Sequence, residues 1–162
     1  MEKFQELREI AKKKINLADH ILTQTYPLLK DPKLLVSVIE NIFLAYTNAI
    51  GSLLHYERLF KRVPQFQDTF ESKWRIFINE CAHKYKIKQS ELDDIRMIKS
   101  IIIKHKKSPM EFVRDGRFVI CSGDYKIDTI SFDELKKLLL NAKVFIANIS
   151  NIVSKHEYIF KR

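Results

Sequence analysis

The segment NAIGSLLHYERLFKR, residues 48–62, passes from an apolar run into a dense set of ionisable side chains. Histidine is the side chain whose ordinary pKa lies nearest neutral pH, so His55 can gain or lose a proton there. Arg58 and Arg62 carry planar guanidinium groups that bind a phosphate through paired hydrogen bonds. Lys61 adds another positive charge. This combination is suited to contact with a phosphodiester.

Four polar residues within and before this segment form one narrow stripe on a predicted helix. They are separated by steps of seven, four and three residues, which keep side chains on one helical face: Asn41, Asn48, Ser52 and His55. Two interpretations remain open. Either the stripe lines a groove in which His55 titrates beside an arginine, or Asn41 and Asn48 make interhelical hydrogen bonds and His55 lies at a solvated end. The second is the expectation, because buried polar groups need partners.

A second basic segment runs over residues 99–117. The negative end of a helix dipole favours cations, so a cluster there is expected even without a ligand. If this segment lies beside the first, the two form one phosphate-binding face. Phe112 and Phe118 either stack bases in that face or pack on the helices. The predicted nucleic-acid contacts are Arg58, Lys61, Arg62, Lys104, His105, Lys106, Lys107, Arg114 and Arg117.

Common catalytic and cofactor motifs are absent from the sequence. There is no glycine-rich phosphate loop, HExxH, CxxC or GxSxG, and three glycines are too few for a glycine-dependent cradle. Cys81 and Cys121 match no metal-ligand spacing and are expected to be reduced core residues. We therefore predict no metal, no cofactor and no catalytic residue. If the protein is nevertheless a metal-independent RNase, its candidate residues are His55, His105 and Arg58.

The bulk properties indicate one globular domain. The chain has 162 residues, of which 46% are hydrophobic and 30% charged, and a net charge of +9. That surplus favours polyanionic partners: RNA, DNA or an acidic protein surface. The charged N-terminus lacks the apolar region of a secretory signal, and no run approaches the ~18 consecutive apolar residues of a membrane span. We expect a cytoplasmic protein that does not enter a membrane.

Apolar periodicity and stop signals predict a mainly α up-and-down bundle of about five helices. The helices are expected over residues 3–26 and 32–61, from about Phe66 to Tyr85, over residues 90–106, and from Ser131 onward. A small β-hairpin, about residues 112–130, lies between helices four and five because Asp115-Gly116 is a strong hairpin signal. The aromatic stripe around Trp74 is expected in the core. The domain covers residues 1–155, and residues 156–162 form a tail.

The helical pattern, the Asn48-Ala49-Ile50 step in a long apolar helix, and arginine and histidine late in the bundle together resemble the HEPN superfamily. The runs ENIFLAYTNAIGSLLHYERLFKR and HKKSPMEF are also similar to an archaeal helical-bundle family, over about residues 15–150. The resemblance implies a helical fold and dimerisation. Active HEPN members are RNases with an arginine and a histidine four to six residues apart. Here Arg75 and His83 are separated by seven residues, and Arg96 and His105 by eight.

The resulting functional hypothesis is a nucleic-acid-associated, HEPN-like module that binds RNA and is non-catalytic or weakly catalytic. The alternative is a protein-interaction or structural dimer module whose basic surface meets an acidic protein.

A homodimer is also predicted, because apolar residues follow one another closely in the last helix and exceed what one chain can cover. The expected interface is this helix with the tail: Val144, Phe145, Ile146, Ile149, Ile152, Val153, Tyr158, Ile159 and Phe160.

Overall fold

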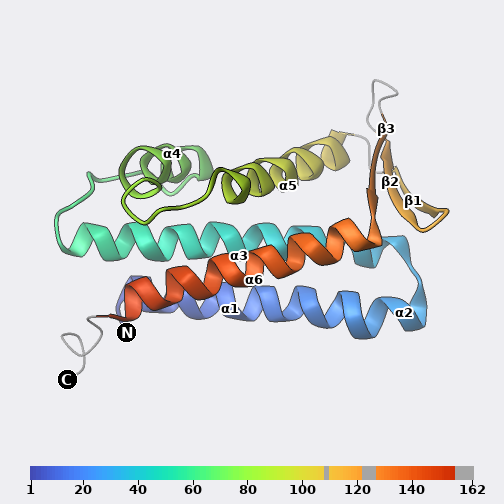
Figure 1. The fold of residues 1–162 in the computed structure, drawn as a ribbon, viewed down its shortest axis with the longest axis horizontal. Helices are drawn as coiled ribbons and strands as arrows, with labels where there is room; N and C mark the ends of the chain where they lie inside the picture. The colour runs from blue at the N-terminus through green and yellow to red at the C-terminus, as the bar shows by residue number, and fades with distance from the viewer. Residues whose placement is uncertain (108–109, 122–126, 156–162) are drawn as a thin grey trace.

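The computed structural model describes residues 1–107, 110–121 and 127–155. Three long helices, α1 (Lys3–His20), α3 (Pro32–Leu59) and α6 (Phe132–Ser154), lie lengthwise beside one another. A short helix, α4 (Phe70–Ile76), and the 19-residue α5 (Gln89–Lys107) cover one side of α3 (Figure 1). A small antiparallel sheet lies between α5 and α6. The predicted mainly α bundle is confirmed.

The first helical segment extends three residues beyond its predicted end. A π-helical stretch, η1 (Ile21–Thr25), follows α1, and α2 (Tyr26–Leu29) completes the segment. Pro27 has no N–H for an α-helical hydrogen bond, and the wider turn of η1 ends two residues before it. The segment ends at Lys30, which adopts the left-handed conformation with φ 51°.

The central helix, α3, begins where the sequence predicts. The side chain of Asp31 accepts a hydrogen bond from the N–H of Lys33 at 3.0 Å, and Pro32 occupies the first turn, where no N–H is needed. By length and composition α3 could cross a membrane. In this structure it packs against α1, α4, α5 and α6, so its apolar side chains form the middle of the core.

The third and fourth predicted helices differ from the sequence-based bounds. Phe66 lies in the connection after α3, and the helix starts only at α4, where the Thr69 hydroxyl accepts a hydrogen bond from the N–H of Ser72. A π-helical stretch, η2 (Phe77–Cys81), follows α4. The next helix, α5, opens one residue earlier than expected. The Glu91 carboxylate accepts a hydrogen bond from the N–H of Lys88, so Ser90 lies inside the helix rather than at its cap.

The predicted hairpin is present and carries a third strand. Strands β1 (Met110–Arg114), β2 (Arg117–Cys121) and β3 (Ile127–Ser131) pair antiparallel in chain order. Asp115 and Gly116 have φ values of 51° and 73°, which suit the tight turn between β1 and β2. Phe118 is buried, so the base-stacking option for it is wrong; the side chain of Phe112 lies outside those described.

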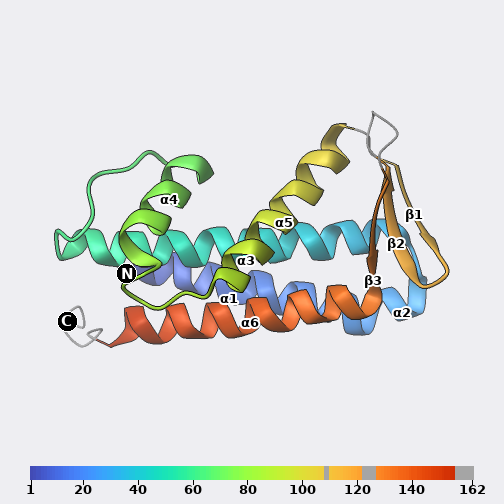
Figure 2. The same cartoon turned by 45° about the horizontal axis from the view of Figure 1, so that its top comes forward.

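The last helix, α6, begins at the predicted cap. The Ser131 hydroxyl accepts from the N–H of Glu134 at 3.1 Å. Figure 2 shows that the sheet lies at one end of the bundle and that α6 runs from the sheet to the other end. There the Arg8 guanidinium donates to the Ser154 hydroxyl at 2.9 Å.

Of the six described residues assigned to a dimer interface, four are buried inside this chain. Phe145, Ile146, Ile149 and Val153 are buried in the core, whereas Val144 is 50% exposed. One turn away, Leu140 is 61% exposed. Ile152 is partly buried, and Tyr158, Ile159 and Phe160 lie outside the described residues. The homodimer stays a prediction, and its surface on α6 is reduced to a short strip.

Replacing Phe145 tests the assignment of the core. Its ring lies 5.1 Å from that of Tyr46 and 6.2 Å from that of Phe77, and the side chain is 1% exposed. Phe145→Ala should lower the free energy of unfolding by about 3–5 kcal/mol, because it leaves a cavity. Val144→Ala, at the exposed neighbouring position, should cost less than about 0.5 kcal/mol. Urea unfolding measures both, and equal losses would contradict this packing.

Candidate nucleic-acid interface

A solvent-open cleft of about 350 Å³ lies where α1 begins and α3 ends. Four basic side chains line it: two on the last turns of α3, one at the start of α1 and one just after α3. The full lining is Glu2, Lys3, Phe4, His55, Arg58, Leu59 and Lys61. Three of the predicted site residues thus share one cleft, and the sequence reasoning missed the contribution of Lys3.

The start of α1 is fixed to α3 by a buried hydrogen bond. The hydroxyl of Ser52 donates to the carbonyl oxygen of Phe4 at 2.6 Å. The ring of Phe4 also meets that of Tyr56 edge-on, at 5.4 Å between centroids. These two contacts hold Lys3 at the same cleft as His55, although the two residues are far apart in sequence.

His55 is half-buried against an aromatic ring in a positively charged environment. Its ring meets Phe66 edge-on, with the centroids 5.1 Å apart. Burial lowers the pKa of His55, and the positive charges of Lys73, Arg58 and Lys3 lower it further, whereas the Asp68 carboxylate opposes them. These charges come from α1, α3, α4 and the connection before α4. His55 is therefore neutral at neutral pH and surrounded by cations.

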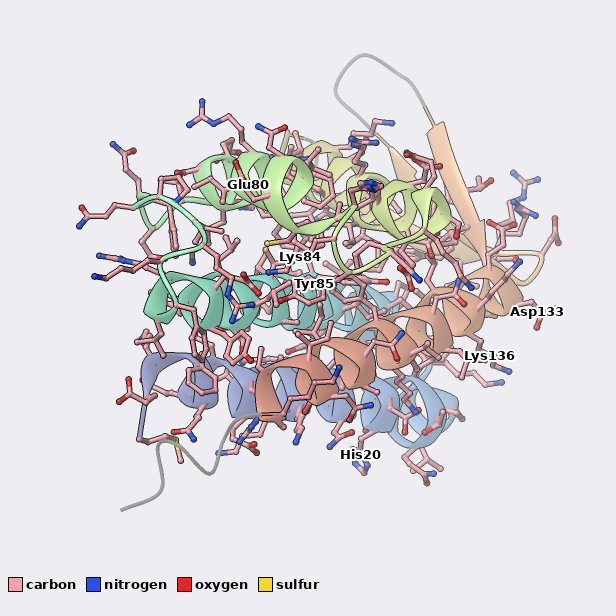
Figure 3. The ribbon with its side chains drawn as sticks, turned by 60° about the vertical axis from the view of Figure 1, so that its left-hand side comes forward. His20, Glu80, Lys84, Tyr85, Asp133 and Lys136 are labelled. Carbon is pink, nitrogen blue, oxygen red and sulfur yellow. The ribbon has the colours of Figure 1, made fainter. Side chains whose placement is uncertain are left out.

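The opposite side of the last turn of α3 holds a buried carboxylate, Glu57, which is 1% exposed. It accepts a hydrogen bond from the Tyr85 hydroxyl and another from the Lys84 amine at 2.9 Å. The Arg62 guanidinium lies 3.6 Å from the same carboxylate. Figure 3 shows Lys84 and Tyr85 in the segment beyond η2, near α3. Arg62 is thus held by Glu57, and it does not line the cleft.

The groups around Glu57 are structural rather than reactive. Burial and then the hydrogen bond to Glu57 raise the pKa of Tyr85, so the hydroxyl keeps the proton that it donates. Burial, together with the charge of Glu57, raises the pKa of the Cys81 thiol to about 12. A thiol of this kind is a poor nucleophile and metal ligand. Cys81 is buried and free, as expected, whereas the side chain of Cys121 lies outside those described.

Two of the cations in the cleft, Arg58 and Lys61, are not compensated by an ion pair within the described part of the chain, whereas Lys3 lies 3.5 Å from Glu6 and Glu2 also lines the cleft. Among the described residues, no carboxylate forms an ion pair with Arg58 or Lys61. The guanidinium carbon of Arg58 lies 5.9 Å from the centre of the Phe66 ring. Lys61 follows α3 in the left-handed conformation, with φ 57°. An anionic ligand would therefore meet cations that are not already neutralised by this part of the chain.

The asparagines of the polar stripe on α3 form hydrogen bonds within their own helix. The amide groups of Asn41 and Asn48 donate to carbonyl oxygens of their own helix, at 2.8 Å to Ser37 and 2.7 Å to Leu44. The interhelical bonds predicted for these two asparagines are therefore wrong. Only Ser52, of the four stripe residues, donates to another helix, and His55 lies in the cleft.

The structure does not bring the two basic segments together. His105 lies against Val36 and Ile39, near the start of α3, about five helical turns from His55. Within one chain the two histidines suggested for an RNase therefore do not share a site, whereas Arg58 and His55 line the same cleft. Lys104 lines another cleft, described below.

The remaining members of the second basic segment point to no shared site. Lys106 is exposed, and the side chain of Lys107 lies outside those described. At the hairpin, Arg114 lies 3.9 Å from Asp115, and Arg117 lies 3.6 Å from Glu134. Within the described part of the chain, no cluster of three histidine, cysteine or acidic side chains is placed to hold a metal ion.

No protein-family model matches this chain, and no curated protein or solved structure does either.

Removing the Glu57 carboxylate tests its role at the end of α3. Glu57→Ala should lower the free energy of unfolding by about 2–4 kcal/mol, because Lys84, Arg62 and Tyr85 lose a shared partner. The loss stays moderate since Lys84 and Arg62 are partly exposed and regain water. Glu40→Ala, at an exposed position of the same helix, is the control and should cost less than about 0.5 kcal/mol. Denaturant unfolding that gave equal values would contradict the assignment.

Proposed function

We propose that the protein is a nucleic-acid-associated helical module that binds RNA through the cleft of Lys3, His55, Arg58 and Lys61, without catalysis. The observation that carries this proposal is the convergence of these four side chains with no ion pair to Arg58 or Lys61 in the described part of the chain. The net charge of +9 supports it, because a positive surface attracts a polyanion over its whole length.

A phosphodiester fits the chemistry of this cleft. Arg58 offers a planar donor pair and Lys61 a flexible ammonium group, and both are donors of the kind that phosphate oxygens accept. A bound phosphate also favours the protonated form of His55, which adds another donor. The resemblance to HEPN proteins, whose active members act on RNA, agrees with this choice of nucleic acid.

Absence of catalysis is part of the proposal. General acid–base cleavage needs groups that donate and accept protons at one reacting phosphate. The cleft supplies one imidazole, and the second candidate histidine, His105, lies near the other end of α3. The cleft is therefore proposed to bind a backbone phosphate of RNA without cleaving the phosphodiester bond.

Replacing Lys61 should weaken RNA binding without lowering the stability of the protein. Lys61→Gly removes one cation and also removes the cost of a left-handed lysine, so stability should stay equal or rise by up to about 1 kcal/mol. Binding to a labelled single-stranded RNA should weaken about fivefold, and the slope of log affinity against log salt should fall by about one. Fluorescence anisotropy between about 50 and 200 mM salt measures both quantities.

Lys30→Gly is the matched control. Lys30 also ends a helix in the left-handed conformation, with φ 51°, but it does not line the cleft. Its replacement removes the same charge and should leave RNA affinity within about twofold. If the two variants lost RNA affinity equally, binding would depend on the overall charge of the protein and not on this cleft. No binding at low salt would favour the alternative, an acidic protein partner.

A further inference from the structure

A second cleft, of about 420 Å³, lies between α4 and α5. Figure 2 shows these two helices side by side over α3. Two aromatic residues from α4 and three basic residues from α5 line it, and the whole lining is Phe70, Trp74, Arg96, Lys99, Ser100, Ile103 and Lys104. Of these residues, only Lys104 was assigned to a site from the sequence.

The aromatic side of this cleft is a supported platform. The rings of Phe70 and Trp74 are nearly parallel, at 18° and 5.6 Å between centroids. Phe43 of α3 lies 5.2 Å from Phe70, and Phe77 lies 5.9 Å from Trp74. Phe77 is fully buried, whereas Phe70 and Trp74 are only partly buried. The expectation that Trp74 belongs to the core is therefore only partly met, because its ring also lines an open cleft.

The basic side of the cleft faces these rings. The Arg96 guanidinium lies 5.5 Å from the centre of the Trp74 ring, and the Lys99 amine lies 4.3 Å from that of Phe70. Lys99 also pairs with Glu71 at 2.8 Å, and Arg96 lies 3.6 Å from Asp93. All of these ion pairs are at least partly exposed, and such pairs contribute little. Arg96 and Lys99 can therefore leave these carboxylates and bind a phosphate group instead.

We propose that the α4–α5 cleft binds a nucleobase of single-stranded RNA, with the base stacked on Trp74 and the flanking phosphates held by Arg96, Lys99 and Lys104. This deepens the proposed function and rests on it. A base stacked on an aromatic ring is worth more than a cation over a ring at an exposed site. A base therefore displaces Arg96 from the ring, and Arg96 becomes available to a phosphate.

The ligand class follows from the same geometry. In a duplex the bases are stacked and paired inside the helix, so their faces are not available to Trp74. An acidic peptide offers carboxylates to Arg96, Lys99 and Lys104 but no planar ring to the platform. The α4–α5 cleft is therefore expected to select single-stranded RNA. The His55 cleft, which is proposed to contact phosphate alone, is not expected to distinguish single strands from duplexes.

Trp74 is the single tryptophan of the chain, so its emission reports on this cleft directly. We would titrate the full chain with a single-stranded oligoribonucleotide, an abasic oligomer with the same number of phosphates, the corresponding duplex, and polyglutamate. The single strand should quench Trp74 emission and bind at least about fivefold more tightly than the abasic oligomer. The abasic oligomer should bind in a salt-dependent way without quenching.

A matched pair of variants completes the test. Ser100 is exposed and lines the cleft, so Ser100→Glu places a carboxylate among the cations and should remove the preference for bases and the quenching. Ser90→Glu adds the same charge at an exposed position of α5 outside the cleft lining and should change neither.

The outcomes separate the two proposals. Equal affinity for the single strand and the abasic oligomer, with no quenching, would overturn the base site and leave the phosphate cleft standing. Quenching by the duplex or by polyglutamate to the same extent would also overturn the base site, and so would equal effects of the two serine variants. No binding of any oligomer at low salt would overturn both proposals.

Discussion

A buried negative charge at the end of the central helix determines how the surrounding cations are arranged. Glu57 is 1% exposed, and a carboxylate without partners in such a position would be very costly. Lys84, Tyr85 and Arg62 satisfy it, so the segment after η2 is tied to the last turn of α3. Arg62 is held there by Glu57, whereas Arg58 and Lys61 line the cleft on the other side of the helix end.

The helical period then decides which side each residue occupies. Residues three apart share a face, so His55 and Arg58 lie together on the side of α3 that meets the start of α1. The buried bond from Ser52 to the Phe4 carbonyl brings Lys3 to that side. The cleft is thus a consequence of the packing of α1 on α3. Its positive charge persists because the acid nearest in sequence, Glu57, lies in the core with other partners.

Local signals in the sequence were sufficient for most of the fold. Asp31 with Pro32, Asp115 with Gly116, and the Ser131 cap each act within a few residues, and each occupies the predicted position. Long-range relations could not be derived in the same way. A polar stripe does not tell whether an asparagine bonds to its own helix or to another. The shared cleft of Lys3 and His55 depends on tertiary contacts that no spacing reveals.

The separation of the two basic segments has a similar cause. Both are dense in lysine and arginine, which suggested a single face, but α3 has 28 residues and spans about 42 Å. The C-terminal end of α5 meets the first part of α3, whereas Arg58 lies at its end. Charge density along a sequence therefore identified basic surfaces, and only the crossing of α5 over α3 showed that they are distinct.

The proposed phosphate site consists of His55 and the positive charges around it. Nuclear magnetic resonance titration of the His55 imidazole, assigned by comparison with His55→Gln, measures its pKa in the free protein and with saturating RNA. The pKa should lie below the ordinary value of about 6.5 in the free protein and should rise clearly with RNA, because bound phosphate stabilises the imidazolium form. An ordinary pKa in the free protein that RNA does not change would contradict it.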